Sequence, residues 1–332
     1  MKTGMPKAAI TGIGTYVPEK VLTNADLEKM VDTSDEWIRT RTGIGERHVL
    51  DESLSTSDMA VAAAHKALQM ADCQPQDLEL IIVATVTGDY VFPSTACVVQ
   101  DRLGATHSAA FDICSSCSGF IAALSTGSQF VRTGQYRKVL VIGADTITRL
   151  VDWQDRNVCV IFGDAASAVV LEPSRNDRGV LSCYLRSDGS GVKYLFQPAG
   201  GAKLPPSHDT VASRQHYIKM DGRETFKTAA KAMCEAAHEA TRMAGMTPKE
   251  IDLVIPHQAN IRIIQAAVQR LGIPMEQVAI NIDRYGNTVA ASIGLAMNEA
   301  LAAGRLVDGS RVLLVGFGAG LTWGGIVLRW GH

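Results

Sequence analysis

Along the chain, segments in which apolar residues have helical spacing alternate with short apolar runs typical of strands. The run Asp58–Met70 combines small and apolar residues at helical spacing and predicts an amphipathic helix. After a short turn, the apolar run Ile81–Thr85 predicts a buried strand. Much later, Thr225–Met243 and Val254–His257 repeat this order of helix and strand. Such alternation over the whole length predicts an α/β protein.

An internal repeat organises these segments. The same offset separates Met70 from Met243 and Pro75 from Pro248. At nearly the same offset, a second block of helix, glycine turn and strand recurs: Cys117–Arg132, Gly134 and Val139–Gly143 match Asn287–Ala302, Gly304 and Val312–Gly316. The repeat predicts two copies of one α/β unit, residues 1–175 and 176–332. Between them, Ser187–Gln215 is rich in Gly, Pro and Ser and predicts a long connecting loop near the join, where function often lies.

Composition narrows the class of protein. The 332 residues are 46% hydrophobic with a net charge of -2, which suits a large core and excludes general affinity for nucleic acid. No apolar stretch is long enough for a membrane span, and the N-terminus has no apolar region long enough for a signal peptide, so we expect a cytoplasmic protein without membrane insertion. Seven cysteines, an odd and scattered set, indicate a reducing compartment rather than a disulfide framework.

Cys117 is the candidate nucleophile. It follows the strand-like segment Ala109–Ile113 and opens an apolar helix, so the helix dipole is expected to lower its pKa. Gly119, two residues later, would let a ligand approach the backbone. Two other interpretations stay open: a buried structural cysteine, and a redox pair with Cys114 in a C-x-x-C motif, as in a thiol-disulfide oxidoreductase.

His257 and Asn287 are the candidate partners of Cys117. His257 ends a strand just before the predicted helix Ile261–Leu271, where a helix N-terminus favours a neutral imidazole that can donate a hydrogen bond. Asn287 opens the last long helix and corresponds in the repeat to Cys117, although an asparagine there can also be a simple helix cap. No set of residues has metal-ligand spacing, so we expect no metal. A thiol, an imidazole and an amide suit acyl transfer from a thioester.

Four motifs in this order resemble the β-ketoacyl-acyl-carrier-protein synthase III family. They are Cys-Ser-Gly-Phe (117–120), Pro-His-Gln-Ala-Asn (256–260), Gly-Asn-Thr (286–288) and Gly-Phe-Gly-Ala-Gly-Leu-Thr-Trp-Gly (316–324), and the N-terminal residues 11–48 are similar too. The resemblance implies a thiolase-like five-layer αβαβα fold built from two pseudo-two-fold-related halves, and a homodimer. It also implies that an acyl-CoA, commonly acetyl-CoA, acylates the cysteine. Malonyl-acyl carrier protein then loses CO₂, and its carbanion attacks the acyl group. The CoA thioester is a substrate, and no cofactor is expected.

The resemblance also assigns individual residues. It makes Cys117, His257 and Asn287 catalytic. The CoA-binding residues that it implies are Thr33, Trp37, Arg41, Arg156 and Asn260, with Trp37 and Arg156 stacked on the adenine. It places Phe92 and Phe317 in the acyl pocket and Lys227, Arg262 and Arg270 in a basic patch for the acyl carrier protein.

Departures from the family pattern leave the choice of substrates open. Val289 replaces a usual serine, Gln269 stands where a lysine is common, and Ser187–Gln215 exceeds the shortest relatives. Related enzymes that use longer or aryl acyl-CoA primers, or a CoA-bound extender, therefore stay open as alternatives. Elongating condensing enzymes would carry a second histidine in place of Asn287. A hydroxymethylglutaryl-CoA synthase-like enzyme would need a glutamate in a region where only Asp89 occurs.

Overall fold

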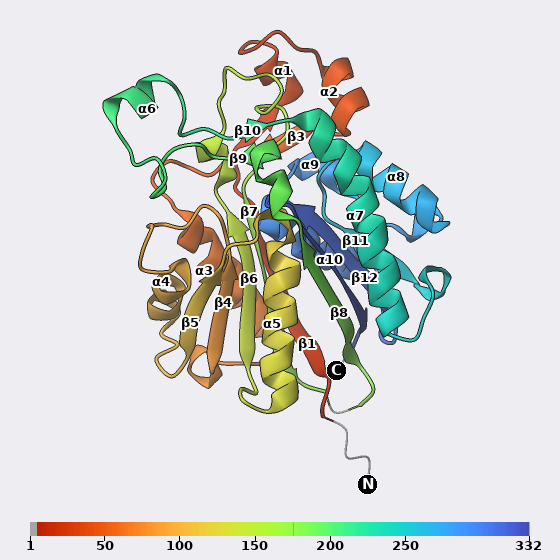
Figure 1. The fold of residues 1–332 in the computed structure, drawn as a ribbon. Coiled ribbons are helices and arrows are strands. Elements are labelled where there is room, and N and C mark those ends of the chain that lie inside the picture. Colours follow the sequence, from red (N-terminus) through yellow and green to blue (C-terminus); the bar gives the residue numbers. More distant parts are fainter. Residues whose placement is uncertain (1–4, 175, 332) are drawn as a thin grey trace.

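Two β-sheets form the core of the computed structural model, which describes residues 5–174 and 176–331 (Figure 1). The first sheet has the order β1 (Ala8–Tyr16), β7 (Ala165–Pro173), β6 (Val139–Asp145), β4 (Leu80–Ala84) and β5 (Ala109–Ile113). The second has the order β11 (Leu253–Pro256), β12 (Arg311–Gly318), β13 (Thr322–Arg329) and β8 (Gly179–Ser187). In each sheet the strands with short apolar runs pair in parallel, β4 with β5 and β6, and β11 with β12.

Helices complete five layers. On the outer face of the first sheet lie α3 (Thr56–Met70) and α4 (Thr95–Leu103), and on the outer face of the second lie α7 (Gly222–Met243) and α8 (Ile261–Leu271). The central layer consists of α5 (Gly119–Thr133) and α10 (Ser292–Ala302), which pack against strands of both sheets (Figure 1). This arrangement confirms the expected αβαβα fold.

The central helices are apolar because both of their faces are covered. Phe120 and Leu124 of α5 are fully buried between the sheets, and removing such a side chain costs about 3–5 kcal/mol. Gly127 lets α5 lie close to the first sheet, since a Cβ there would come within 3.0 Å of Val141. The outer helix α7 instead presents a stripe of buried alanines to the second sheet and charged residues to solvent.

Short elements surround the ends of the sheets where the candidate residues lie. They are β2 (Val21–Thr23), α1 (Asn24–Leu27), α2 (Asp35–Thr42), β3 (Glu46–His48), β9 (Leu195–Phe196), α6 (His208–Ala212), β10 (Lys219–Met220) and α9 (Ile282–Tyr285). The expected loop Ser187–Gln215 is therefore only partly irregular, because β8 extends to Ser187 and the segment contains β9 and α6. No helix of the described part of the chain is long and apolar enough to cross a membrane.

Two predicted helix starts need correction. The helix expected from Cys117 begins at Gly119, and Cys117 lies in the preceding 3-10 turn Ser116–Ser118. Likewise the helix expected from Asn287 begins at Ser292, after the 3-10 turn Val289–Ala291. All strands of the first sheet precede the predicted unit boundary, and all strands of the second sheet follow it. Residue 175 lies outside the described residues, so the exact boundary stays a prediction.

Candidate active site

One cavity of about 450 Å³ is lined by Cys117, His257 and Asn287 together. The three residues come from the turn after β5, the end of β11 and the turn after α9. The turn that carries Cys117 contacts β12 of the second sheet and the turn Val289–Ala291 that follows Asn287. Gly318 of β12 also lines the cavity. The structure thus brings together the three residues that the motifs singled out.

Cys117 is 6% exposed and follows Ser116, whose φ of 44° marks a strained turn. Burial and, to a smaller extent, the nearby Asp145 carboxylate raise the pKa of the thiol to about 12, although hydrogen bonds from its own backbone N–H and from the Asn287 side chain act in the opposite direction. The expected fall in pKa is therefore wrong. The thiol lies in a dry turn before the helix, and the loss of hydration outweighs the favourable interactions.

His257 is 1% exposed at the end of β11. Its backbone N–H donates to Val315 O at 2.8 Å, and its Nδ1 lies 2.6 Å from the Ser292 hydroxyl. Its Nε2 is buried without a hydrogen-bond partner among the described residues. Burial lowers the imidazole pKa to about 3, so the ring is neutral, as expected, although the cause is desolvation.

Two backbone hydrogen bonds hold Asn287 in place. Its N–H donates to Ile161 O at 2.9 Å, and its carbonyl accepts from Gly163 N at 3.1 Å. The side-chain Oδ1 accepts from Val289 N at 3.0 Å, which leaves the amide Nδ2 as the donor for the cavity and for the Cys117 thiol. Val289 has a φ of 49°, a left-handed backbone conformation that is uncommon for a β-branched residue.

Several of the predicted CoA-binding residues line the same cavity. Trp37, Arg41 and Asn260 do so directly. The Arg156 guanidinium carbon lies 5.2 Å from the centre of the Trp37 ring, and that of Arg41 lies 5.9 Å from it. Asn260 caps α8 through Arg262 N, and its amide donates to Arg41 O at 2.9 Å, which ties α8 to the end of α2.

Thr33 and Arg156 do not line this cavity. The Thr33 hydroxyl is buried and has no partner among the described residues, so it has a free capacity for hydrogen bonding. Arg156 instead donates to Asp32 O at 2.8 Å and lies beside Trp37 at the cavity mouth.

A second, mostly apolar cavity of about 200 Å³ also opens on Cys117. The other residues that line it come from separate segments of both halves of the chain: Val86, Ser116, Ile147, Leu150, Phe162, Leu195, Phe196, Gln197, Ile218, Val289 and Ala319. Phe317 lines the larger cavity instead of this one. Phe92 is 84% exposed on the segment after β4 and lines neither cavity of a single copy of the chain, so its placement in an acyl pocket stays a prediction.

The predicted basic patch is exposed on two neighbouring helices. Lys227 lies on α7, while Arg262 and Arg270 lie on α8, which packs beside α7 (Figure 1). Sequence reasoning missed Arg223 and Lys231, which flank Lys227 at four-residue spacing and therefore share its helix face.

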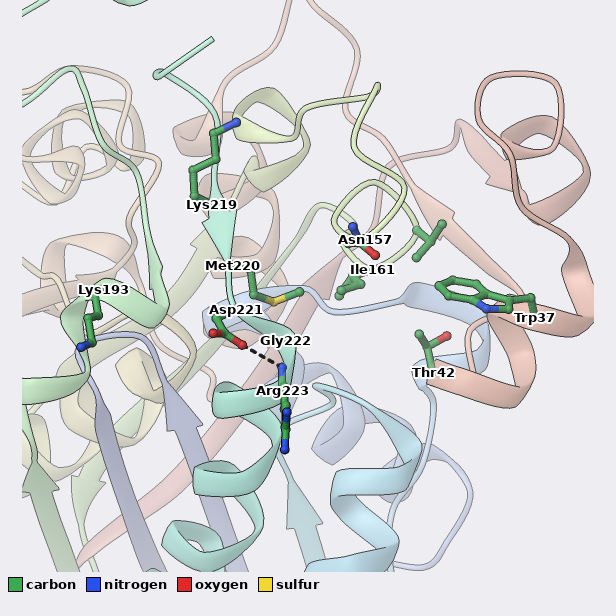
Figure 2. Close-up of a pocket in the computed structure, with 11 residues that line it drawn as sticks. Trp37, Thr42, Asn157, Ile161, Lys193, Lys219, Met220, Asp221, Gly222 and Arg223 are labelled. Carbon is green, nitrogen blue, oxygen red and sulfur yellow. Dashed lines mark hydrogen bonds between the residues drawn. The ribbon is translucent and has the colours of Figure 1, made fainter. Parts of the chain in front are cut away.

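A further cavity of about 650 Å³ shares Trp37 with the active-site cavity. Its basic residues are Lys193, Lys219 and Arg223, but their side chains point in different directions (Figure 2). They do not converge on one point and so do not form a single basic cluster (Figure 2).

Comparison with known proteins supplies the family. The chain matches the family models for 3-oxoacyl-[acyl-carrier-protein] synthase III over residues 111–189 and for the C-terminal part of that enzyme over residues 241–330. It is 54% identical to the β-ketoacyl-[acyl-carrier-protein] synthase III of Caldanaerobacter subterraneus over 97% of this chain and 98% of the relative. It is 51% identical to the enzyme of the same name from Geobacillus kaustophilus, over 98% and 99% of the two chains.

Solved structures agree with this relationship. The 3-oxoacyl-[acyl-carrier-protein] synthase III of Aquifex aeolicus matches with a TM-score of 0.90 at 46% identity, over 97% of this chain and 100% of that one. A priming β-ketosynthase of the R1128 polyketide pathway matches with a TM-score of 0.91 at 32% identity, over 99% and 98% of the two chains. The chain belongs to the β-ketoacyl-[acyl-carrier-protein] synthase III family, the acyltransferases that catalyse the initiating condensation of fatty-acid synthesis.

Proposed function

We propose that Cys117 accepts an acyl group from acyl-CoA and that His257 and Asn287 then promote its decarboxylative condensation with malonyl-acyl carrier protein. The observation that carries this proposal is the single cavity that unites these three residues with Trp37 and Asn260. A nucleophile, two neutral hydrogen-bond donors and an aromatic ring at the mouth suit a thioester on a long pantetheine arm.

In the first step, the Cys117 sulfur attacks the thioester carbonyl of the acyl-CoA. The carbon–sulfur bond to CoA breaks, the acyl group stays on Cys117, and the thiol proton leaves on the CoA sulfur. The high pKa of Cys117 and the neutral His257 support proton loss in concert with attack rather than a preformed ion pair.

In the second step, malonyl-acyl carrier protein loses CO₂ and the electron pair of the broken bond enters an enolate. Hydrogen bonds from His257 Nε2 and Asn287 Nδ2 to the thioester oxygen stabilise that enolate. Its carbon attacks the acyl group on Cys117, a carbon–carbon bond forms, and the released thiolate takes a proton from solvent. The product is a 3-ketoacyl-acyl carrier protein, and no cofactor is required.

Adenine binding between Trp37 and Arg156 requires a movement of the arginine. A ring between two planes needs about 7 Å, since each contact takes about 3.5 Å. The guanidinium lies only 5.2 Å from the Trp37 centre, so we propose that Arg156 swings away from Asp32 when the adenine enters. Arg41 would then meet the phosphates and Thr33 the polar part of the CoA.

The second cavity supports a short primer. If each non-hydrogen atom needs roughly 30 Å³, as a water molecule does, about 200 Å³ holds about six or seven such atoms. Acetyl-CoA therefore fits easily, and short branched or straight acyl groups fit as well. Long and aryl primers would require the surrounding segments to move.

Exposed charged and apolar residues support two protein partners, an acyl carrier protein and a second copy of the chain. Lys227, Arg262 and Arg270 suit an acidic carrier protein that must deliver its arm to the adjoining cavity. For a homodimer, the support is the open edge strand β5 together with the exposed apolar run Tyr90–Phe92, whose side chains are 64–96% exposed. Seven free cysteines support a reducing cytoplasm.

Intact-protein mass spectrometry after exposure to a panel of acyl-CoAs tests the proposal. We expect one acyl adduct on the wild type and on C114S, none on C117A, and transfer of the adduct when malonyl-acyl carrier protein is added. Cys114 is the matched control because it lies three residues from the nucleophile and is exposed. An adduct on C117A, or none on the wild type, would overturn the proposal, and loss of activity in C114S would favour the redox pair.

A further inference from the structure

We propose that Ser292 is a positioning residue that fixes the tautomer of His257, so that Nε2 carries the proton and faces the substrate as a hydrogen-bond donor. Ser292 is the first residue of α10 and is 1% exposed, and its hydroxyl lies 2.6 Å from His257 Nδ1. This inference rests on the proposed function, in which His257 donates to the thioester oxygen.

The distribution of hydrogen-bond donors determines the direction of this bond. A buried hydroxyl must find an acceptor for its proton. His257 Nδ1 is the acceptor that the described residues offer, because the other contact of the Ser292 oxygen, at 3.5 Å, is with Gln258 N, which can only donate. The Ser292 O–H therefore donates to Nδ1, and the proton of the neutral ring lies on Nε2.

The opposite arrangement would leave one more buried group unsatisfied and would reverse the polarity of Nε2. If Nδ1 carried the proton and donated to Ser292, the serine proton would have no acceptor. Nε2, which has no partner among the described residues, would then present a lone pair to the cavity. An unpaired buried polar group costs about 1–3 kcal/mol, and a lone pair at Nε2 would repel a developing enolate oxygen.

Ser292 acts mainly on the ring, because its bond with His257 Nδ1 is 2.6 Å long, whereas the bond that it accepts from the backbone at Gln258 N is 3.5 Å long. The strand end is fixed separately, by the bond from His257 N to Val315 O at 2.8 Å. The next residue, Gln258, anchors the loop through bonds from its amide to Pro256 O at 2.8 Å and to Ala279 O at 3.1 Å. Loss of the Ser292 hydroxyl should therefore leave the loop in place and free the ring to change its tautomer.

The test compares S292A with S182A. Ser182 is also a buried serine, 5% exposed, and donates to Ala240 O at 2.6 Å away from the cavity. For S292A we expect decarboxylation of malonyl-acyl carrier protein to fall about 10–100-fold in kcat, with KM changed less than about threefold. The range lies below the 10²–10⁴-fold that a positioned proton donor contributes. For S182A we expect the wild-type rate.

Nitrogen-15 NMR of histidine-labelled protein reads the tautomer without requiring activity. The His257 signal is assigned by its absence from H257A, and we expect a protonated Nε2 and an unprotonated Nδ1 in the wild type. In S292A we expect a shift of population toward the form protonated on Nδ1. A wild-type ring protonated on Nδ1, or an S292A protein with unchanged tautomer and rate, would overturn the inference. If the wild type fails to decarboxylate but shows the expected tautomer, the proposed function fails and the assignment of Ser292 stands.

Discussion

The Asp152–Arg214 ion pair lies outside the second cavity but connects two segments that line it. The Asp152 carboxylate is almost buried and accepts from Arg214 Nε at 3.0 Å and from Arg214 Nη2, with Lys219 Nζ 3.8 Å away. The pair joins two segments that line the second cavity, which we call the acyl cavity because it is proposed to hold the primer: one contributes Leu150 and the other Ile218. We therefore predict that D152N loosens the acyl cavity and slows acylation.

The expected magnitude lies between those of an exposed and a buried pair. A buried pair costs 3–5 kcal/mol when one partner is removed, and an exposed pair about 0–1. Because the Arg214 side chain is 38% exposed, we discount the buried value to about 1–2 kcal/mol. That loss corresponds to a roughly tenfold increase in local opening.

Hydrogen exchange measures this opening directly. The Ile218 N–H donates to Leu150 O at 2.8 Å across the two segments, so its exchange should accelerate about tenfold in D152N, and short acyl-CoAs should acylate Cys117 more slowly. D252N is the control, because Asp252 forms a similar bidentate pair with Arg311, whose side chain is 35% exposed, away from the cavity. Unchanged exchange at Ile218, or equal slowing of acylation in D252N, would refute the reasoning.

The same pair gives a pH dependence with a definite sign. The hydrogen bond from Arg214 lowers the pKa of Asp152 below its ordinary value of 3.8. The contribution of the pair to stability is thus present above about pH 4 and is lost as pH falls through the lowered pKa. A smaller protection factor for the Ile218 N–H on acidification below pH 4 in the wild type, but not in D152N, is the expected result.

Two further substitutions test the buried surroundings of the nucleophile. In G318A the new Cβ would lie 2.8 Å from Cys117 N, so acylation measured by mass spectrometry should fall more than about tenfold, whereas G316A, whose Cβ meets nothing nearer than 3.4 Å, should keep most of it. Burial raises the pKa of Asp145 to about 6, so the folded protein loses stability as the carboxyl ionises between pH 4 and 7. Relative to D145N, the wild type should lose roughly 1–3 kcal/mol of unfolding free energy over this range, measured by urea denaturation at both pH values. A pH-independent difference would contradict the assignment of a buried, ionising carboxyl.

The sequence predicted those features that are encoded in short stretches of chain. The helix now observed as α5 ends where expected, because Gly134 adopts the left-handed conformation with a φ of 75°. Cys117, His257 and Asn287 were found because each lies in its own motif at the end of a predicted element. The repeat then gave a physical reason for two of them to meet.

Features that depend on several distant segments were not predicted. Val86, Ile147 and Ile218 reach the acyl cavity from different parts of the chain, and none stands in a pattern that distinguishes it from an ordinary core residue. The exposure of Phe92 was not predicted either, because its sequence neighbourhood does not reveal that the segment after β4 projects outward. The role of Ser292 likewise depends on a contact between α10 and the end of β11.

Burial explains why both reactive groups of this site rest without charge. The same loss of hydration raises the pKa of Cys117 and lowers that of His257, so a thiolate–imidazolium pair is disfavoured from both sides. Because the thiol and the imidazole are both neutral before substrate arrives, the oriented N–H groups of the site interact most strongly with the negative charge that develops during reaction. The acylation rate should consequently show no inflection near pH 6.5 from His257, because that ring stays neutral down to about pH 3.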